Sequence, residues 1–349
     1  MSFFSKIFNS NKQKPSLTND SITELFIRIA IPSSVGTIFQ TLYNVVDTYF
    51  AGKISPEALS AIAQTFPVFF IIIAMGVGLS IGITALIANA IGEKNDKNAS
   101  YILAQGVILS TLVAIIVTVI GIIVAPYIIT TISKSNTSLS LSLDYLNIIF
   151  LGSIFIFIQM SMNASLNAIG DTKSYRNVLI FSFFLNIILN PILISGNFLN
   201  FSVFEPLGVS GIAIATILSQ LIGLFYLFYK ITKTEIYNVF KKEFLIPKFI
   251  LLKEILLQCI PASIGLMMIA LGSYIILYFV SIYGNNAIAG FSSAGRYEQL
   301  LFLPLLGLST AVTAIVGQNL GAKQPERVLE TFKKAISTGF ILLSIVAVI

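Results

Sequence analysis

The chain contains an internal repeat at an offset of 229 residues, and this repeat constrains its fold more than any other feature. The start of the second copy aligns with the start of the first without a gap. An apolar composition alone seldom aligns proline, glycine and lysine, yet these residue types are among the matches: Ile31–Gly36 with Ile260–Gly265, Gly78–Ser80 with Gly307–Ser309, Gly92 with Gly321, and Lys94 with Lys323. A long repeat in an apolar chain predicts two homologous helical bundles, an arrangement typical of transporters.

Composition places the chain in a membrane. Hydrophobic residues make up 56% of it and charged residues 10%, and the mean hydropathy is +0.91. Soluble domains carry about 25% charged residues. Apolar runs long enough to cross a bilayer recur between short polar links, which is the helical pattern. We therefore predict an all-α polytopic membrane protein whose helices span residues 24–51, 57–91, 99–132, 142–168, 177–199, 208–230, 254–283, 287–320 and 328–349.

Lysine and arginine gather in alternate links between these spans. They occur in the N-terminal tail, in the links 92–98 and 169–176, and in the segment 231–253. By the positive-inside rule these segments are cytoplasmic. We expect an integral, multi-pass protein of the cell's inner (plasma) membrane, with a cytoplasmic N-terminus and membrane lipid around it. Juxtamembrane anchoring accounts for the net charge of +6, so we expect no nucleic-acid partner.

The segment 231–253 is polar and separates the two copies. We divide the chain into a cytoplasmic tail (1–20), an N-lobe of six helices (21–230), a cytoplasmic linker (231–253) and a partial C-lobe of three helices (254–349). Ser21 and Glu24 have the spacing of a capping box that would start the first helix. The apolar run that ends at Ile349 is short for a span, so we expect the chain to stop inside its ninth helix, about three helices short of two complete lobes.

Asp47 is the leading candidate for a functional residue, because an ionisable group inside a membrane span is costly to keep there. It shares one helical face with residues three or four positions apart, namely Ser33, Thr37, Gln40 and Asn44. Hydrogen bonds between helices can explain the uncharged members of this stripe, whereas a carboxylate favours a functional role. Gln40 and Asn44 are thus cavity candidates, and in the second copy we add the polar residues that interrupt an apolar run: Arg296, Glu298 and Gln299.

Enzymatic chemistry finds little support. The chain has no histidine, and its single cysteine, Cys259, can form neither an internal disulfide nor a metal cluster. Gly78–Gly82 matches the letters of a nucleophile elbow but lies in an apolar span, where small residues serve helix packing. We expect neither an enzyme nor a resident metal or cofactor. An intramembrane enzyme is an alternative that the lack of clustered carboxylates disfavours.

Four segments together resemble the MATE family of multidrug and toxic compound extrusion transporters, and within it the DinF-like branch. They are Leu42–Gly52, Ile91–Lys94, Asn167–Lys173 and Asn186–Pro191. The resemblance covers the chain from about residue 20 to its end. It implies a twelve-helix protein of two six-helix lobes, expected to be a monomer. Such a protein exports cationic amphipathic compounds by alternating access, in exchange for protons or sodium ions.

The resemblance also implies roles for individual residues. Asp47 matches an aspartate that is central to cation coupling, and Tyr145 and Asn186 match two members of the same network. Asn190 departs from the pattern, because some members carry aspartate there, which puts a two-acid site in doubt. Thr216 is a looser match on the sixth helix.

A flippase for lipid-linked saccharides from the same superfamily is the alternative function. Its anionic pyrophosphate substrate would require several cationic residues in the cavity. Arg296 is the candidate that the sequence offers for that role. The scarcity of such residues favours the export of cations.

Overall fold

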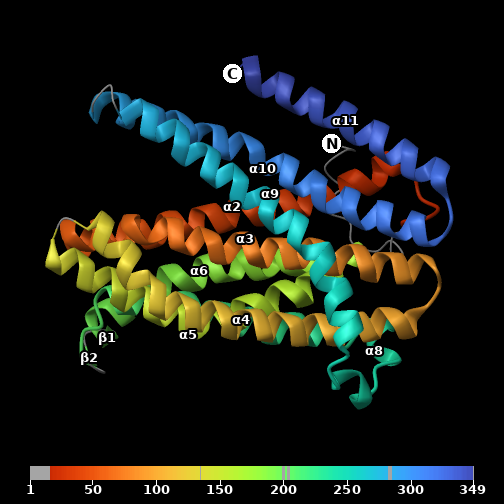
Figure 1. The fold of residues 1–349 in the computed structure, drawn as a ribbon, viewed down its shortest axis with the longest axis horizontal. Helices are drawn as coiled ribbons and strands as arrows, with labels where there is room; N and C mark the ends of the chain where they lie inside the picture. The colour runs from red at the N-terminus through yellow and green to blue at the C-terminus, as the bar shows by residue number, and fades with distance from the viewer. Residues whose placement is uncertain (1–15, 134, 199–200, 203–204, 282–284, 349) are drawn as a thin grey trace.

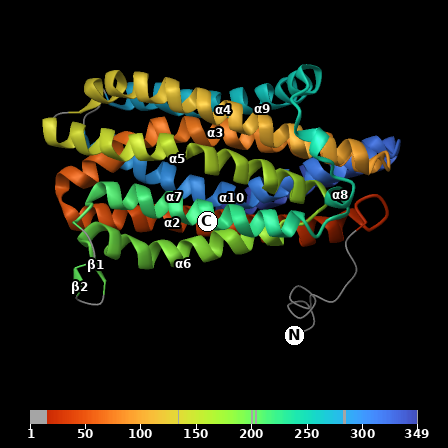
Figure 2. The same cartoon turned by 90° about the horizontal axis from the view of Figure 1, so that it is seen from below.

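The computed structural model describes residues 16–133, 135–198, 201–202, 205–281 and 285–348. In these residues long helices run back and forth beside one another (Figures 1 and 2). The first bundle consists of α2 (Ile22–Ile54), α3 (Pro56–Gly92), α4 (Asp96–Ile132), α5 (Asn136–Ala168), α6 (Lys173–Ser195) and α7 (Val209–Ile231). It is followed by α9 (Phe249–Ser281), α10 (Asn285–Gly321) and α11 (Pro325–Val348). The all-α fold expected from the sequence is confirmed.

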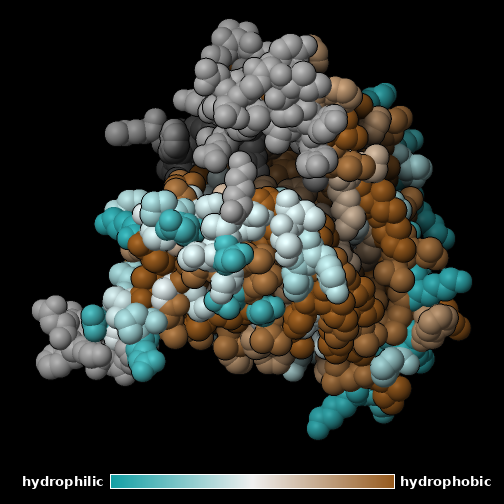
Figure 3. All heavy atoms as spheres, turned by 60° about the vertical axis from the view of Figure 1, so that its left-hand side comes forward, coloured by the Kyte–Doolittle hydropathy of each residue, from teal (hydrophilic) through white to brown (hydrophobic). Residues whose placement is uncertain are grey.

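The two ends of the bundle differ in their connections. One end carries the links 93–95, 169–172, 232–248 and 322–324. Lysines lie within three of these links, and Lys173 follows the link 169–172 directly, so we call this end the basic end; it lies on the right in Figure 1. The opposite end carries the turn at Ser55 and a small antiparallel hairpin of β1 (Asn197–Phe198) and β2 (Phe201–Ser202). Hydrophobic residues cover the flank of the bundle between these ends in Figure 3.

Short polar side chains start several helices. The Ser55 hydroxyl accepts a hydrogen bond from the Ala58 amide (3.1 Å) ahead of α3, and Asn95 and Ser135 cap α4 and α5 in the same way. The capping box expected at Ser21 is wrong. Helix α2 does begin at Ile22, but the Ser21 side chain makes no capping bond, and Glu24 instead pairs with Arg28 one turn later (2.9 Å).

The repeat in the sequence is also a repeat of structure. Helices α2 and α9 both have 33 residues, and α3 and α10 both have 37. Shifting Pro56 and Gly92, the ends of α3, by 229 positions gives 285 and 321, the ends of α10. The turns that follow both contain a lysine at positive φ, with 58° at Lys94 and 56° at Lys323. The two copies therefore share their backbone geometry.

Eight of the helices are long and apolar enough to cross a membrane, counted over the described part of the chain. The run expected at 328–349 is helical, as α11, but is not among these eight. Charged residues crowd its first turns, including Glu326, Arg327 and Glu330. The span expected at 177–199 also ends early, because Gly196 adopts a left-handed conformation (φ 71°) that terminates α6 at Ser195.

The linker between the copies is folded against α4. It contains the short helix α8 (Glu235–Asn238) and the 3₁₀ turn η1 (Lys242–Leu245). The buried Gln105 side chain of α4 holds it by donating to the carbonyls of Phe244 (2.7 Å) and Ile246 (2.9 Å) and accepting from the Lys248 amide (2.9 Å). One side chain thus satisfies three backbone groups of a segment that precedes α9.

The two copies make their closest backbone contact at the basic end. A Cβ atom at Gly92 would overlap the carbonyl oxygen of Gln318, and one at Gly321 would overlap the carbonyl oxygen of Asn89. Both pairs are related by the 229-residue offset, so α3 and α10 cross nearly symmetrically. Toward the other end α9 and α10 diverge from α2 and α3 (Figure 1).

Candidate functional site

Asp47 lies at the centre of a buried hydrogen-bond network. Its side chain comes from α2 and is 5% exposed. One carboxylate oxygen, Oδ1, accepts from the side-chain amides of Asn186 (2.9 Å) and Asn190 (3.0 Å), and Oδ2 accepts from the Thr216 hydroxyl (3.2 Å). Three neutral donors from two other helices therefore surround one carboxylate.

Helix α6 presents two of these donors because Asn186 and Asn190 are one turn apart. Both are fully buried, and the Asn190 amide also donates to Asn186 Oδ1 (3.0 Å). The Asn190 Oδ1 atom has no hydrogen-bond partner among the described residues. Pro191 follows at once and has no N–H to donate to the previous turn, which opens the backbone beside the site.

A cavity adjoins this network. Its lining includes Tyr43, Gln40 and Asn44 of α2, Tyr145 of α5 and Thr216 of α7. The empty space between the lining side chains, counted with its open mouth, is about 580 Å³, but only a small part is wide enough for a water molecule. In this conformation the cavity suits an ion with water. A drug-sized compound would need a wider space.

Electrostatics gives this cavity its chemistry. Among the lining residues that the structure describes, Asp47 is the one carboxylic acid, and lysine and arginine do not occur. A buried carboxylate without a cationic partner is costly, even with good hydrogen bonds. Binding a cation, whether a proton, a metal ion or an organic cation, removes that cost. The network is therefore arranged to hold a positive charge.

The structure brings most of the candidates from the sequence together and leaves some undescribed. Asp47, Asn186, Asn190 and Thr216 are hydrogen-bonded, and Gln40, Asn44 and Tyr145 line the same cavity. The side chains of the three C-lobe candidates, Arg296, Glu298 and Gln299, lie outside the described residues.

Sequence reasoning missed Tyr43 and Gln220 among the lining residues, although helical spacing could have found them. Tyr43 is four residues before Asp47, and Gln220 is four residues after Thr216, so each shares a face with a recognised site residue. Gln159 of α5 lines the cavity and donates to the Gln220 carbonyl (2.9 Å). Gly223 makes room for it, because a Cβ there would overlap the Gln159 amide.

A second polar cluster joins the two copies at the basic end. Gln318 of α10 donates to the Ala168 carbonyl at the end of α5 (2.7 Å), and the fully buried Asn319 donates to the Leu17 carbonyl (2.9 Å). Arg327 of α11 bridges Asn319 Oδ1 (2.9 Å) and the Asp20 carbonyl (2.8 Å). The basic end of the interface is therefore closed by hydrogen bonds to main-chain carbonyls.

Comparison with known proteins assigns the family. The probable multidrug resistance protein NorM of Thermotoga maritima is 31% identical over 90% of this chain, and the FAD transporter of Shewanella oneidensis is 26% identical over 95%. The chain spans 66% and 72% of the lengths of these two relatives. A solved structure described as the outward-facing conformation of a multidrug resistance MATE family transporter superposes with a TM-score of 0.85, at 27% identity, covering 97% of this chain and 74% of the other.

Two of these relatives are named as transporters and the third as a multidrug resistance protein, so the intramembrane enzyme considered from the sequence finds no support among them. The family pattern itself matches residues 32–192 and 261–349, which is most of the chain. The match covers both copies of the repeat and includes Asp47, Asn186 and Asn190. The chain belongs to the MatE family of membrane transporters.

Proposed function

We propose that the protein is a cation-coupled antiporter that exports cationic amphipathic compounds, with a proton or a sodium ion moving inward at Asp47. One observation carries this proposal, namely a buried carboxylate that is hydrogen-bonded by neutral donors in a cavity whose described lining residues include no basic side chain. The names of relatives such as NorM support the class of compound. The basic end is cytoplasmic in this proposal, as the distribution of lysines predicts.

Coupling follows from competition for one negative charge. When the cavity is open to the outside, a proton or sodium ion neutralises Asp47. Neutralisation weakens the hydrogen bonds that the three donors of α6 and α7 make to the Asp47 carboxylate, so the packing of these helices against α2 can change. A cationic compound arriving from the cytoplasmic side would be attracted to the same charge once it is restored. Since one carboxylate cannot bind both, uptake of the ion and release of the compound are linked.

The inner and outer parts of the cavity have different roles in this proposal. The inner network around Asp47 holds the coupling ion, since the space there suits an ion. The compound itself binds toward the mouth, where Gln40 is half-buried and Asn44 is exposed on the same face of α2. Aromatic residues at the cavity, Tyr43, Phe69 and Tyr175, offer the faces that flat cations prefer.

The flippase alternative is less compatible with this cavity. A lipid-linked pyrophosphate is anionic, and the charged group among the described lining residues is a carboxylate. The same repulsion disfavours a dinucleotide substrate such as that of the Shewanella relative.

We further propose that the protein acts as a monomer and that residues 21–230 form one lobe, since the whole network around Asp47 comes from α2, α6 and α7.

The test is ethidium export from proteoliposomes under an imposed proton or sodium gradient. The variant Asp47→Asn should abolish the gradient-driven component while the protein still inserts. Asp144→Asn is the matched control, because Asp144 is an exposed acid of α5 outside the cavity lining, and it should behave as the parent. Undiminished gradient-driven export by Asp47→Asn would refute the assignment of Asp47 as the coupling residue. Whichever of the two gradients drives export by the parent identifies the coupling ion.

A further inference from the structure

The linker between the copies lies along the flank of the bundle and not beyond its tip. Its contacts on α4 are Tyr101 and Gln105, which are five and nine residues after the start of that helix at Asp96. At 1.5 Å per residue these contacts are about 8 and 14 Å inside the tip of the helix. Figures 1 and 2 show the linker beside the helices, inset from the α3–α4 turn. Helix α4 has 37 residues and is about 55 Å long, so a bilayer of about 40–45 Å centred on it leaves each tip outside the headgroups. With that placement the linker lies in the headgroup region.

The outer side of the linker exposes large apolar side chains. Ile246 is 62% exposed, Phe249 78% and Ile250 84%. Phe249 is also the first residue of a helix that is apolar enough to cross a membrane. Side chains of this kind at this depth face lipid, because exposure of a contiguous apolar patch to water would be costly.

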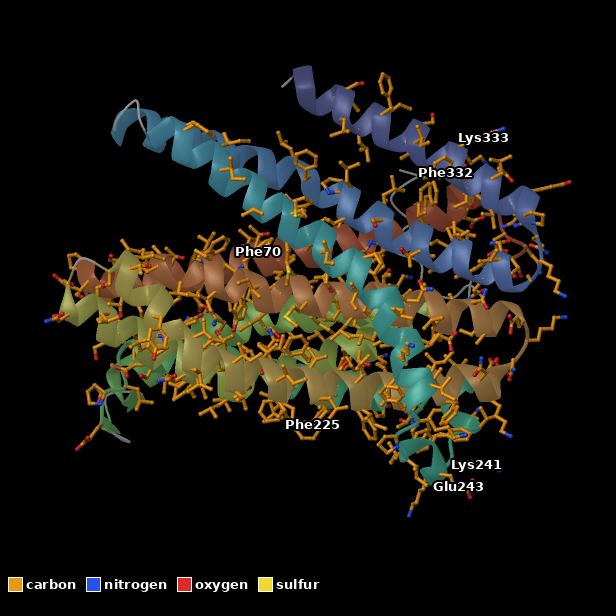
Figure 4. All side chains as sticks on the ribbon, in the orientation of Figure 1. Phe70, Phe225, Lys241, Glu243, Phe332 and Lys333 are labelled. Atoms are coloured by element: carbon orange, nitrogen blue, oxygen red, sulfur yellow. The ribbon has the colours of Figure 1, made fainter. Side chains whose placement is uncertain are left out.

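Lysines surround these apolar residues. Lys241, Lys242 and Lys248 are exposed, and Figure 4 shows Lys241 on the outer edge of the linker. Neither Lys241 nor Lys242 forms an ion pair with a described carboxylate. The Lys248 ammonium lies 5.0 Å from the centre of the Tyr101 ring. Glu243, also at the outer edge in Figure 4, is the acidic residue between them, so the local charge stays positive.

We propose that this surface is a binding site for the headgroups of anionic phospholipids. We name it the linker patch, consisting of Lys241, Lys242, Leu245, Ile246, Lys248, Phe249 and Ile250. The apolar members enter the acyl region and the lysines bind the phosphate, as amphipathic interfacial segments do. The three hydrogen bonds between Gln105 and the linker backbone fix the patch before any lipid arrives, which lowers the entropy cost of binding.

The position of the linker patch gives this binding a consequence. The patch ends in the first turn of α9, which packs along α3 and opens the second copy. A bound headgroup therefore fixes the start of α9 at the membrane surface. Through this contact the lipid composition of the inner leaflet sets the position of α9 relative to α4. The site lies on the flank, apart from the Asp47 cavity, and does not depend on which ion or compound is transported.

The absence of tryptophan from the chain makes a local test possible. A single Ile250→Trp variant, reconstituted in bilayers, reports only on the linker patch. We expect brominated phosphatidylglycerol to quench its fluorescence more strongly than brominated phosphatidylcholine, with an apparent affinity ratio of about tenfold or more. Adding Lys241→Gln, Lys242→Gln and Lys248→Gln should bring that ratio close to one. Ile246→Trp provides a second reporter.

Matched controls separate a site from general charge. Lys97→Gln, Lys173→Gln and Lys333→Gln remove the same charge from exposed lysines outside the patch and should leave the ratio unchanged. Ile120→Trp, half-exposed on α4, should be quenched equally by both lipids and checks insertion. Equal quenching of Ile250→Trp by both lipids, or none by either, overturns the proposal. If the tryptophan becomes less accessible to brominated lipid as the protein density in the bilayer rises, a second copy of the chain is the occupant. That result would overturn the proposal as well.

Discussion

The crossing of α3 and α10 leads to a specific prediction about Gly321→Ala. An added Cβ at this position would overlap the carbonyl oxygen of Asn89 and would lie 2.9 Å from its carbonyl carbon and 3.0 Å from the Glu93 amide nitrogen. All three are main-chain atoms of the other copy, so no flexible side chain can move out of the way. Helices α3 and α10 must separate at the basic end.

The size of the effect follows from the kind of atoms involved. Overpacking typically costs about 1–3 kcal/mol, and contact with main-chain atoms places this variant near the upper value. A cost of about 3 kcal/mol lowers the population ratio of molecules with α3 and α10 in contact at the basic end to molecules with these helices separated by roughly 100-fold. Alanine also gains up to about 1 kcal/mol of helix propensity over glycine, but that gain is the same in both conformations and does not oppose the separation.

Accessibility of a buried thiol measures the separation. Ala314 of α10 is fully buried against α2, so Ala314→Cys in a Cys259→Ala background supplies a single reporter thiol. A membrane-impermeant maleimide should label it slowly in the parent and much faster after Gly321→Ala. Gly265→Ala in α9 is the matched control, because no described atom lies within 4 Å of its added Cβ. Labelling of the Gly321→Ala variant at the parent's rate would refute the reasoning.

Two further predictions concern the hydrogen bonds that hold the linker and the basic end. Gln105→Leu keeps the size of the side chain but leaves the Phe244 and Ile246 carbonyls and the Lys248 amide without partners, so we expect a loss of about 1–3 kcal/mol and faster proteolysis within 232–248. An unchanged cleavage rate would mean that the linker is held by its apolar contacts alone. Arg327→Lys cannot reproduce the forked contact with Asn319 and the Asp20 carbonyl, so hydrogen exchange at 17–20 should accelerate; unaltered protection there would contradict this role.

The sequence predicted the frame of this fold because two strong signals agree on it. Long apolar runs locate the helices. The 229-residue offset of the repeat converts the first and last residues of α3 into those of α10. The limits of helices were harder to predict where local chemistry decides them. Gly196 ends α6 before its apolar run is over, and Ser21 makes no cap although its spacing to Glu24 suggests one.

The candidate site shows the same division. Helical spacing placed Asp47, Asn44 and Gln40 on one face, and the family resemblance added Asn186, Asn190 and Thr216. Which of them touch could not be predicted, because contacts between helices depend on rotations that single-helix periodicity does not fix. The linker's attachment to Gln105 was invisible for a related reason. A glutamine that donates to main-chain carbonyls 139 and 141 residues away leaves no local pattern.

The sharpest test of the network itself is Asn190→Asp. It replaces an amide that donates to Asp47 Oδ1 at 3.0 Å with a second carboxyl at the same place. Two ionised carboxylates at about 3 Å repel by about 5 kcal/mol at an effective dielectric constant near 20, so the folded pair retains a proton that the unfolded chain has lost at neutral pH. Stability of the variant must then fall as pH rises, more steeply than that of the parent.

The charge swap provides the control for this prediction. In the double variant Asp47→Asn with Asn190→Asp, a single carboxyl again faces neutral amides, and the extra pH dependence should vanish. Thermal unfolding between about pH 5 and 8 is measured for the parent, the two single variants Asp47→Asn and Asn190→Asp, and the double variant. The four stabilities give the coupling free energy between positions 47 and 190. A pH dependence of Asn190→Asp that equals the parent's, or one that persists in the double variant, would show that residues 47 and 190 do not share a site. The coupling mechanism would then lose its physical basis, since it requires α6 to respond to the charge on α2.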